Sequence, residues 1–162
     1  MKSVLAIVMF SWIWLPAHAA AEDLEASPQV SRWLDVYHRF DLEGFLDFYA
    51  ADTRFIDPTA RIDFTSRQQL RRAYMGIMQG RYGGNYKFDV NRMVTQENTV
   101  VLEGLFSLTW NGQKANINFT TWLEFKNGKI TRQLDMFDYN SLQRQIPTFG
   151  QGLPSEYTGP RN

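Results

Sequence analysis

The chain predicts an α+β fold in which a curved antiparallel sheet forms a cone around three N-terminal helices. Apolar residues recur at helical spacing up to residue 80, and the period changes to two after Asn85. Two Asn-Gly pairs, at 111–112 and 127–128, indicate tight hairpins between the last strands. Neighbouring long strands twist by about 20°, so we expect the sheet to curl around the helices and leave an apolar interior with an open mouth.

Residues 1–19 are predicted to be a signal peptide. Lys2 gives a positive start, Val4 to Leu15 is apolar and uncharged, and Ala17-His18-Ala19 has the form of a signal-peptidase site. A membrane-spanning helix needs about 20 apolar residues, and this run is shorter and ends in Pro16. We therefore expect an exported protein, periplasmic or secreted, with no membrane association after cleavage.

Composition limits the possible partners and chemistry of what remains. One domain is predicted over residues 20–146, followed by a Pro/Gly-rich C-terminal tail over 147–162. The 17 basic residues balance 17 acidic ones, which argues against a nucleic-acid partner. There is no cysteine, and removal of His18 leaves His38 as the one histidine, so zinc sites of Cys and His are excluded. We expect neither a metal nor an organic cofactor.

Capping residues place the three helices. Ser27-Pro28 is typical of a helix start and predicts a helix over 28–40. Asp41 can cap a second helix, predicted over 42–51. Ser66 and Gln69 have capping-box spacing and predict a third helix over 66–80.

Asp57 is the first candidate for chemistry. A short strand is expected after the second helix, and Asp57 stands at its end beside Pro58, which cannot extend a strand ladder. A carboxylate fixed at a strand end can serve as a proton shuttle. Its alternative role is to accept backbone N–H groups in a turn.

The first hairpin fixes which residues face the interior. A two-residue turn at Asn111-Gly112 pairs Trp110 with Gln113, Phe106 with Ile117 and Leu102 with Thr121. The inward face of the following strand is then Ile117, Phe119, Thr121, Leu123 and Phe125.

The order of elements and four short segments resemble the SnoaL-like branch of the nuclear transport factor two-like superfamily. The segments are Asp41 to Phe45, Tyr49 to Pro58, Gly128 to Ile130 and Asp135 to Asp138. The resemblance covers roughly residues 28–145 and implies the cystatin-like cone of that superfamily, which also includes ketosteroid isomerases and limonene-epoxide hydrolases. One such scaffold hosts many functions.

The resemblance implies a partial match to two catalytic sets. Asp57 falls at the general base of ketosteroid isomerases, but their two oxyanion donors fall at Trp33 and Thr121. Asp135 falls at the catalytic aspartate of SnoaL-type cyclases and epoxide hydrolases. The arginine and second aspartate of the hydrolases fall at Gly104 and Phe106, so neither set is complete.

The orientation of Asp135 depends on the second hairpin. If Asn127-Gly128 is a two-residue turn, Leu134 pairs with Thr121 and Asp135 points outward. If the loop has three residues with a bulged glycine, Gln133 pairs with Thr121 and Asp135 faces the cavity, because a one-residue slip reverses every side chain. The hydrophobic pattern favours the first register and the family resemblance favours the second, which we follow.

Two functions of different classes remain. The first is binding of a small hydrophobic molecule in an apolar pocket. The alternative is a cofactor-independent acid/base enzyme, of isomerase, cyclase or hydrolase type, that uses Asp57 with or without Asp135. For either function the expected ligand contacts are Trp33, Tyr37, Phe55, Tyr74, Met78, Phe106, Thr121 and Phe137.

The preferred register also predicts a homodimer. It places four apolar side chains on the outer face of the sheet, where they need a covering partner. These are Leu105, Trp122, Leu134 and Met136.

Overall fold

The structure, a computed structural model, describes residues 23–80 and 83–151. The predicted signal peptide and residues 152–162 of the predicted tail lie outside the described residues. The elements are α1 (Asp23–His38), α2 (Leu42–Leu46), β1 (Tyr49–Asp57), β2 (Ile62–Phe64), α3 (Arg67–Met78), β3 (Gly84–Gln96), β4 (Thr99–Trp110), β5 (Gln113–Lys126), β6 (Lys129–Phe137) and α4 (Tyr139–Gln145).

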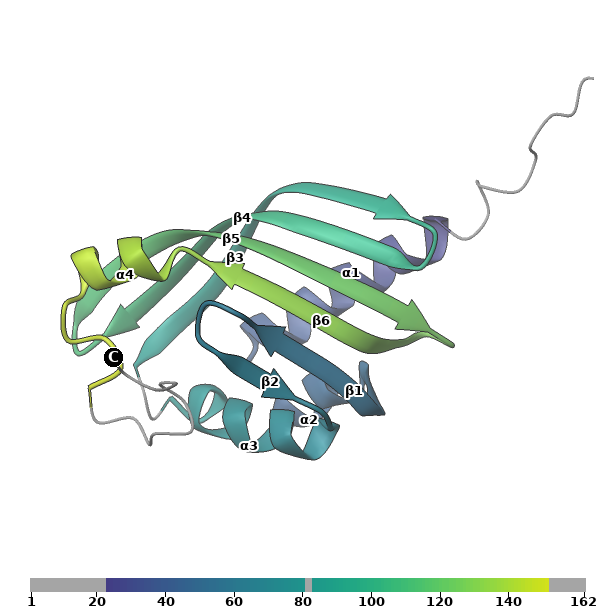
Figure 1. Ribbon diagram of the computed structural model, residues 1–162, viewed down its shortest axis with the longest axis horizontal. Helices are drawn as coiled ribbons and strands as arrows, with labels where there is room; N and C mark the ends of the chain where they lie inside the picture. The colour runs from purple at the N-terminus through teal and green to yellow at the C-terminus, as the bar shows by residue number, and fades with distance from the viewer. Residues whose placement is uncertain (1–22, 81–82, 152–162) are drawn as a thin grey trace, which may run out of the picture.

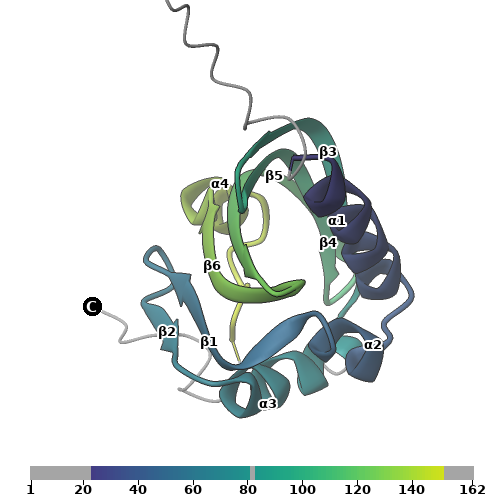
Figure 2. The ribbon, with the colours of Figure 1, turned by 90° about the vertical axis from the view of Figure 1, so that its right-hand side faces the viewer.

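The strands form one curved, unclosed sheet in the order β2-β1-β6-β5-β4-β3. All neighbours are antiparallel except β1 and β6, which run parallel. Figure 1 shows the long strands crossing the molecule, and Figure 2 shows the sheet curling around an interior that α1 and α3 flank. The predicted α+β cone is therefore confirmed.

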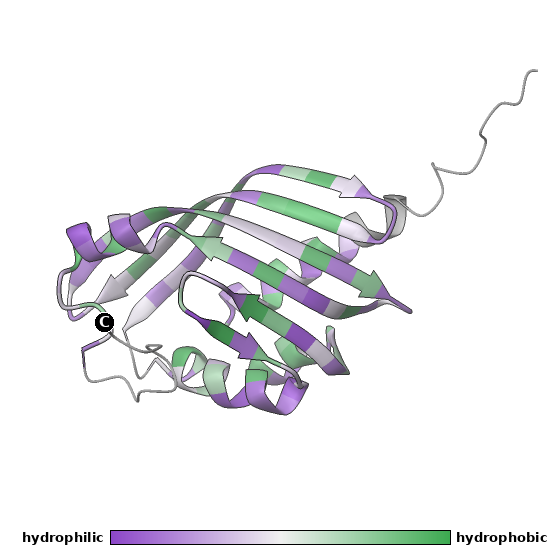
Figure 3. Cartoon of the chain, viewed as in Figure 1, coloured by the Kyte–Doolittle hydropathy of each residue, from purple (hydrophilic) through white to green (hydrophobic). Residues whose placement is uncertain are grey.

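The interior face of the sheet carries the core. Buried and less buried residues alternate along β4 and β5, as a sheet with one covered face requires. Bands of opposite hydropathy alternate along the same strands (Figure 3). The buried hydrophobic residues on these strands are Val100, Leu102, Phe106, Leu108, Trp110, Ala115, Ile117, Phe119, Leu123 and Phe125.

The first hairpin has the predicted register. Trp110 pairs with Gln113, Phe106 with Ile117 and Leu102 with Thr121. Asn111 and Gly112 both have positive φ, 48° and 79°, as a two-residue hairpin turn of this hand needs.

The second hairpin differs from both predicted registers. Lys126 pairs with Lys129, so Asn127 and Gly128 form a two-residue turn and the predicted three-residue loop is wrong. A β-bulge then shifts the pairing, and Thr121 lies opposite Asp135 rather than Gln133. Asp135 nevertheless faces the interior as expected, with a side chain that is buried.

Thr131 is the extra residue of this bulge. Its neighbours Ile130 and Arg132 pair with Phe125 and Glu124, which are consecutive in β5. The Thr131 hydroxyl donates to the Glu124 carbonyl oxygen at 3.2 Å. The sequence does not predict this bulge, because its extra residue is a threonine and not the glycine that marks a G1 bulge.

The second predicted helix, 42–51, is too long. Helix α2 ends at Leu46, and Tyr49–Asp57 is a nine-residue strand. The Ile130 N–H donates to the Phe48 carbonyl oxygen at 2.7 Å, and Tyr49 pairs with Ile130. Pairing with a strand that lies far away in the sequence therefore overrides the local helical pattern.

Helix α3 nearly matches its predicted range, α1 begins five residues before its predicted start, and two elements were not predicted. Helix α1 starts at Asp23 rather than Pro28, and α3 spans Arg67–Met78 with Ser66 as its N-cap. Strand β2 and helix α4 are additional. In α4 the Asp138 carboxylate caps the helix by accepting the Ser141 N–H at 2.8 Å.

The predicted tail begins with an ordered part. Residues 147–151 form turns after α4, and Phe149 packs on Trp110 with ring centroids 5.1 Å apart. Among the described residues, no helix has the length and apolar character that crossing a membrane requires.

Candidate active site

A cavity of about 440 Å³ opens between the inner face of the sheet and the helices. Residues from α1, β1, α3, the long strands and α4 line it, together with the segment after α4. Most of the lining is aromatic or aliphatic, which is typical of a small-molecule site. The aromatic members are Tyr37, Phe55, Phe64, Tyr74, Tyr86, Phe88, Phe106, Trp110, Phe137, Tyr139 and Phe149.

Asp57 is one of two carboxylates on this wall. It ends β1 and is 2% exposed. Its Oδ1 accepts the Ala60 N–H at 2.9 Å, and its Oδ2 accepts the Tyr139 hydroxyl, also at 2.9 Å. Burial raises the pKa of Asp57, and these two hydrogen bonds oppose the rise because they favour the charged form.

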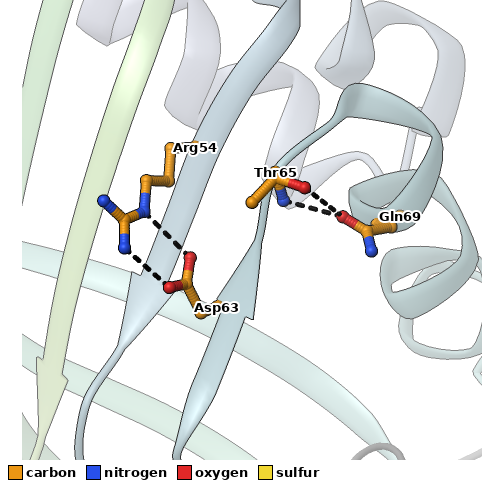
Figure 4. Close-up of polar contacts among 4 residues, drawn as sticks. All are labelled: Arg54, Asp63, Thr65 and Gln69. Atoms are coloured by element: carbon orange, nitrogen blue, oxygen red, sulfur yellow. Dashed lines mark hydrogen bonds and ion pairs between the residues drawn. The ribbon is translucent and has the colours of Figure 1, made fainter.

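The β1–β2 hairpin holds the turn that follows Asp57. Asp57 pairs with Ile62, and the Arg54 guanidinium binds both carboxylate oxygens of Asp63 at 3.0 and 2.7 Å (Figure 4). Next to it, the Thr65 N–H donates to Gln69 Oε1 at 2.7 Å and ties the end of β2 to α3. These exposed contacts fix the backbone that carries the buried carboxylate.

Helix α4 brings Tyr139 to Asp57. The Gln145 side chain anchors the helix to β5 by donating to the Asn116 carbonyl oxygen at 2.8 Å and accepting the Asn116 N–H at 3.1 Å. Tyr139 stands in the first turn, and its pKa is raised well above the usual value by burial and by Asp57. Its hydroxyl therefore stays protonated and acts as a donor.

Asp135 is the second carboxylate and lies deeper in the protein. It is 1% exposed, and the Gln133 amide nitrogen donates to both of its oxygens at 2.9 Å. Burial raises the pKa of Asp135 to about 7, against the opposing effects of Gln133 and Thr121. The charge of Asp57 raises it further. Asp135 is therefore half ionised near neutral pH.

A chain of buried donors ends on Asp135. Trp33 Nε1 donates to the Tyr49 hydroxyl at 3.0 Å, and that hydroxyl donates to Gln133 Oε1 at 2.6 Å. The Gln133 amide then faces the carboxylate, so all three groups donate in the same direction. In such a series each hydrogen bond polarises the next one, and the last donor, the Gln133 amide, orients the carboxylate.

Comparison with known families agrees with this architecture. A family model described as SnoaL-like domain matches residues 30–133. The chain belongs to the SnoaL-like domain family.

Solved structures show the same fold at low sequence identity. A candidate SnoaL-like polyketide cyclase from Shewanella denitrificans has a TM-score of 0.68 at 18% identity, covering 75% of this chain and 96% of that chain. A second candidate SnoaL-like polyketide cyclase, from Shewanella putrefaciens, has a TM-score of 0.67 at 20% identity, covering 75% of this chain and 96% of that chain. An LEH-like epoxide hydrolase of M. tuberculosis has a TM-score of 0.67 at 14% identity, covering 79% of this chain and 93% of that chain. No curated protein sequence matches the chain.

The SnoaL-like cone brings most of the sequence-predicted site residues together. Asp57 and Asp135 both line the cavity, as do Tyr37, Phe55, Tyr74, Phe106 and Phe137. Trp33, Met78 and Thr121 are buried but lie outside the lining. Trp33 is connected to the site through its hydrogen bond to the Tyr49 hydroxyl. Thr121 lies opposite Asp135 in the sheet.

Three polar residues of the site were not singled out from the sequence. Gln133 occurs two residues before Asp135, and a strand places such residues on the same face. Tyr139 directly follows Asp138, the N-cap of α4, a helix that the sequence does not predict. Tyr49 was assigned to a helix, so its contact with β6 could not be foreseen. Within residues 23–80 and 83–151, no three His, Cys, Asp or Glu side chains gather to hold a metal.

We expect Gln133→Met to raise the pKa of Asp135 above about 7, because the carboxylate loses its amide donor. The Tyr49 hydroxyl loses its acceptor, which should lower the free energy of unfolding by about 2 kcal/mol. An NMR titration of the Asp135 carboxyl carbon and urea unfolding measure the two effects. Gln68→Met, on the exposed face of α3 and outside the cavity lining, is the control. An unchanged titration of Asp135 would show that the donor chain does not tune it.

Proposed function

We propose that this protein is a cofactor-independent enzyme that moves a proton on a small, largely apolar, carbonyl-bearing molecule. One observation carries the proposal: the cavity contains a buried carboxylate, Asp135, with a pKa of about 7. A general base is most effective when its pKa is close to the working pH. An ordinary aspartate, ionised far below neutral pH, would be a much weaker base.

The two carboxylates differ in their surroundings, which supports separate roles. Asp135 receives its hydrogen bonds from Gln133 inside the protein and is the proposed base. Asp57 shares a hydrogen bond with Tyr139, so this pair can orient the substrate or return the proton. The charge of Asp57 makes a small contribution to the raised pKa of Asp135, so the ionisation of Asp57 disfavours that of Asp135.

The chemistry of the best-known relatives does not transfer directly. Trp33 stands at an oxyanion-donor position of ketosteroid isomerases, but its N–H already serves Tyr49 and it does not line the cavity. A side chain at position 104, where the hydrolases have arginine, would begin at a Cβ only 2.0 Å from the Asp89 carbonyl oxygen. We therefore infer neither steroid isomerisation nor epoxide hydrolysis.

Simple binding of a hydrophobic molecule is the second candidate. The mainly aromatic and aliphatic lining supports it, since such walls suffice for binding. It gives no reason for a buried carboxylate with a raised pKa, and so the enzyme is the better account.

We expect the protein to accelerate hydrogen–deuterium exchange next to the carbonyl of one or more compounds in a panel of small ketones and 1,3-diketones. The rate should rise with pH through about 7, because the base must be ionised. Asp135→Asn should lower it by about 10²–10³-fold. Proton NMR in D₂O measures the exchange.

Asp52→Asn is the matched control, since Asp52 is exposed on the same strand as Asp57. It should exchange at the wild-type rate, with circular dichroism confirming that both variants fold. If Asp135→Asn is as fast as wild type, or if no compound of the panel is accelerated, the proposal fails.

We also propose that two copies pair through the outer sheet face. Leu105, Trp122 and Met136 are 40%, 41% and 42% exposed. The register aligns Val94, Val101, Trp122, Leu134 and Ile56 in a row across five strands. Two ion pairs, Arg92–Glu103 and Arg132–Glu124, flank this row and place positive and negative charges beside it. An apolar row with balanced charges suits a two-fold self-interaction.

Sedimentation at micromolar concentration should therefore give a dimer for wild type. Trp122→Lys should give a monomer, because two charges would be buried at the contact. Gln68→Lys adds the same charge on the exposed face of α3 and should remain dimeric. A monomeric wild type would contradict the pairing.

We propose, finally, that the protein is exported and cleaved after Ala19. The charged start, apolar run and Ala17-His18-Ala19 site support it. Expressed with its full sequence in a bacterial host, the protein should appear in the periplasmic fraction. Its measured mass should equal that of a chain whose first residue is Ala20. A full-length product in the cytoplasmic fraction would contradict export.

A further inference from the structure

We infer that the ligand of this cavity is an organic cation whose ammonium group faces Asp57 and Asp135. Its apolar part would lie against the aromatic wall. The inference names the substrate class of the proposed function and therefore depends on the proposed use of the cavity.

The charge of the cavity wall is the first observation. Asp57 and Asp135 are both part of it, and among the described lining residues none is Lys, Arg or His. The tyrosines that face Asp135 from α1, β1, α3 and α4 are Tyr37, Tyr49, Tyr74 and Tyr139, and raised pKa values keep them neutral. The protein itself therefore offers no positive charge to these two acids inside the cavity.

The hydrogen bonds of the two acids are the second observation. Asp57 accepts from the Ala60 N–H and the Tyr139 hydroxyl, and Asp135 accepts twice from the Gln133 amide. All these partners are donors, which suit a carboxylate rather than a neutral acid. These hydrogen bonds favour the ionised forms, whereas burial disfavours them, so two anions here are costly without a counter-charge. A cationic ligand supplies that charge.

The arrangement of the rings is the third observation. Tyr86, Phe106, Phe137 and Tyr139 form a continuous series with successive centroids 6.1, 5.1 and 5.9 Å apart. The series ends at Asp57, to which the Tyr139 hydroxyl is bonded. Alkylammonium groups bind well against aromatic faces, because the ring quadrupole attracts the charge while the methyl groups bury apolar surface.

These features suit an organic rather than an inorganic cation. Calcium and magnesium require about six or more oxygen ligands. Two carboxylates in an aromatic wall provide too few oxygens, but they match a cation whose own surface is apolar.

Two isosteric probes test the inference: benzyltrimethylammonium and its uncharged carbon analogue neopentylbenzene. Isothermal titration calorimetry at about pH 8, above the pKa of Asp135, should show the ammonium binding at least about tenfold more tightly. The quaternary nitrogen has no proton to lose, so any pH dependence belongs to the protein. The ammonium affinity should fall as the pH is lowered from about 8 to about 6, because Asp135 takes up a proton near pH 7. The affinity for neopentylbenzene should not fall.

Substitutions locate the charge that is recognised. Asp57→Asn and Asp135→Asn should each weaken ammonium binding by about tenfold or more, and neopentylbenzene binding by much less. Asp135→Asn should also remove the dependence on pH near 7. The exposed Asp52→Asn changes the net charge equally and should bind both probes like wild type.

Equal affinity for the two probes, or no detectable ammonium binding at millimolar concentration, would overturn the inference. Both results use the wild-type protein, so they do not depend on the folding of a variant. If the protein accelerates exchange of uncharged ketones but does not prefer the ammonium probe, the proposed enzyme stands and only the cationic ligand is rejected. If the protein prefers the ammonium probe but accelerates no ketone exchange, the cation-binding pocket stands and the proposed enzyme is rejected.

Discussion

The candidate site depends on the bulge at Thr131 in β6. Before the bulge, Ile130 faces the interior, and after it Gln133, Asp135 and Phe137 lie opposite the inward residues of β5. Without the extra residue, Arg132, Leu134 and Met136 would occupy that face, since side chains alternate strictly along a strand. The inner face of β6 would then carry an arginine and two apolar residues instead of the buried carboxylate and its amide donor. One backbone irregularity thus determines the polarity of the interior.

Burial makes this polar pair chemically useful. An aspartate surrounded by aromatic rings loses its hydration, and the loss raises its pKa toward neutrality. Trp33, Tyr49 and Gln133 limit that loss by directing donors at the carboxylate. The opposed effects leave Asp135 able to exchange a proton near pH 7. A more exposed carboxylate would stay ionised, and one without donors would stay protonated.

The second acid shows how separate elements meet at one place. Asp57 comes from the end of β1, held by the β1–β2 hairpin, and Tyr139 comes from α4, which Gln145 anchors to β5. The rings of Phe137 and Tyr139 join the two acids to the aromatic wall. The proposed catalysis, ligand binding and charge recognition can therefore be tested at the same few side chains.

The sequence alone determined the α+β cone, the first hairpin and the strand-end position of Asp57. These features rest on local signals: capping residues, the change of period and the Asn-Gly turns. Only the tertiary structure decided that Tyr49 belongs to a strand, that a bulge turns Gln133 and Asp135 inward, and that Tyr139 reaches Asp57. Tyr49 and Tyr139 are placed by contacts between segments far apart in the chain, and the bulge by the pairing of β6 with β5. The energy of such contacts is not determined by either segment alone.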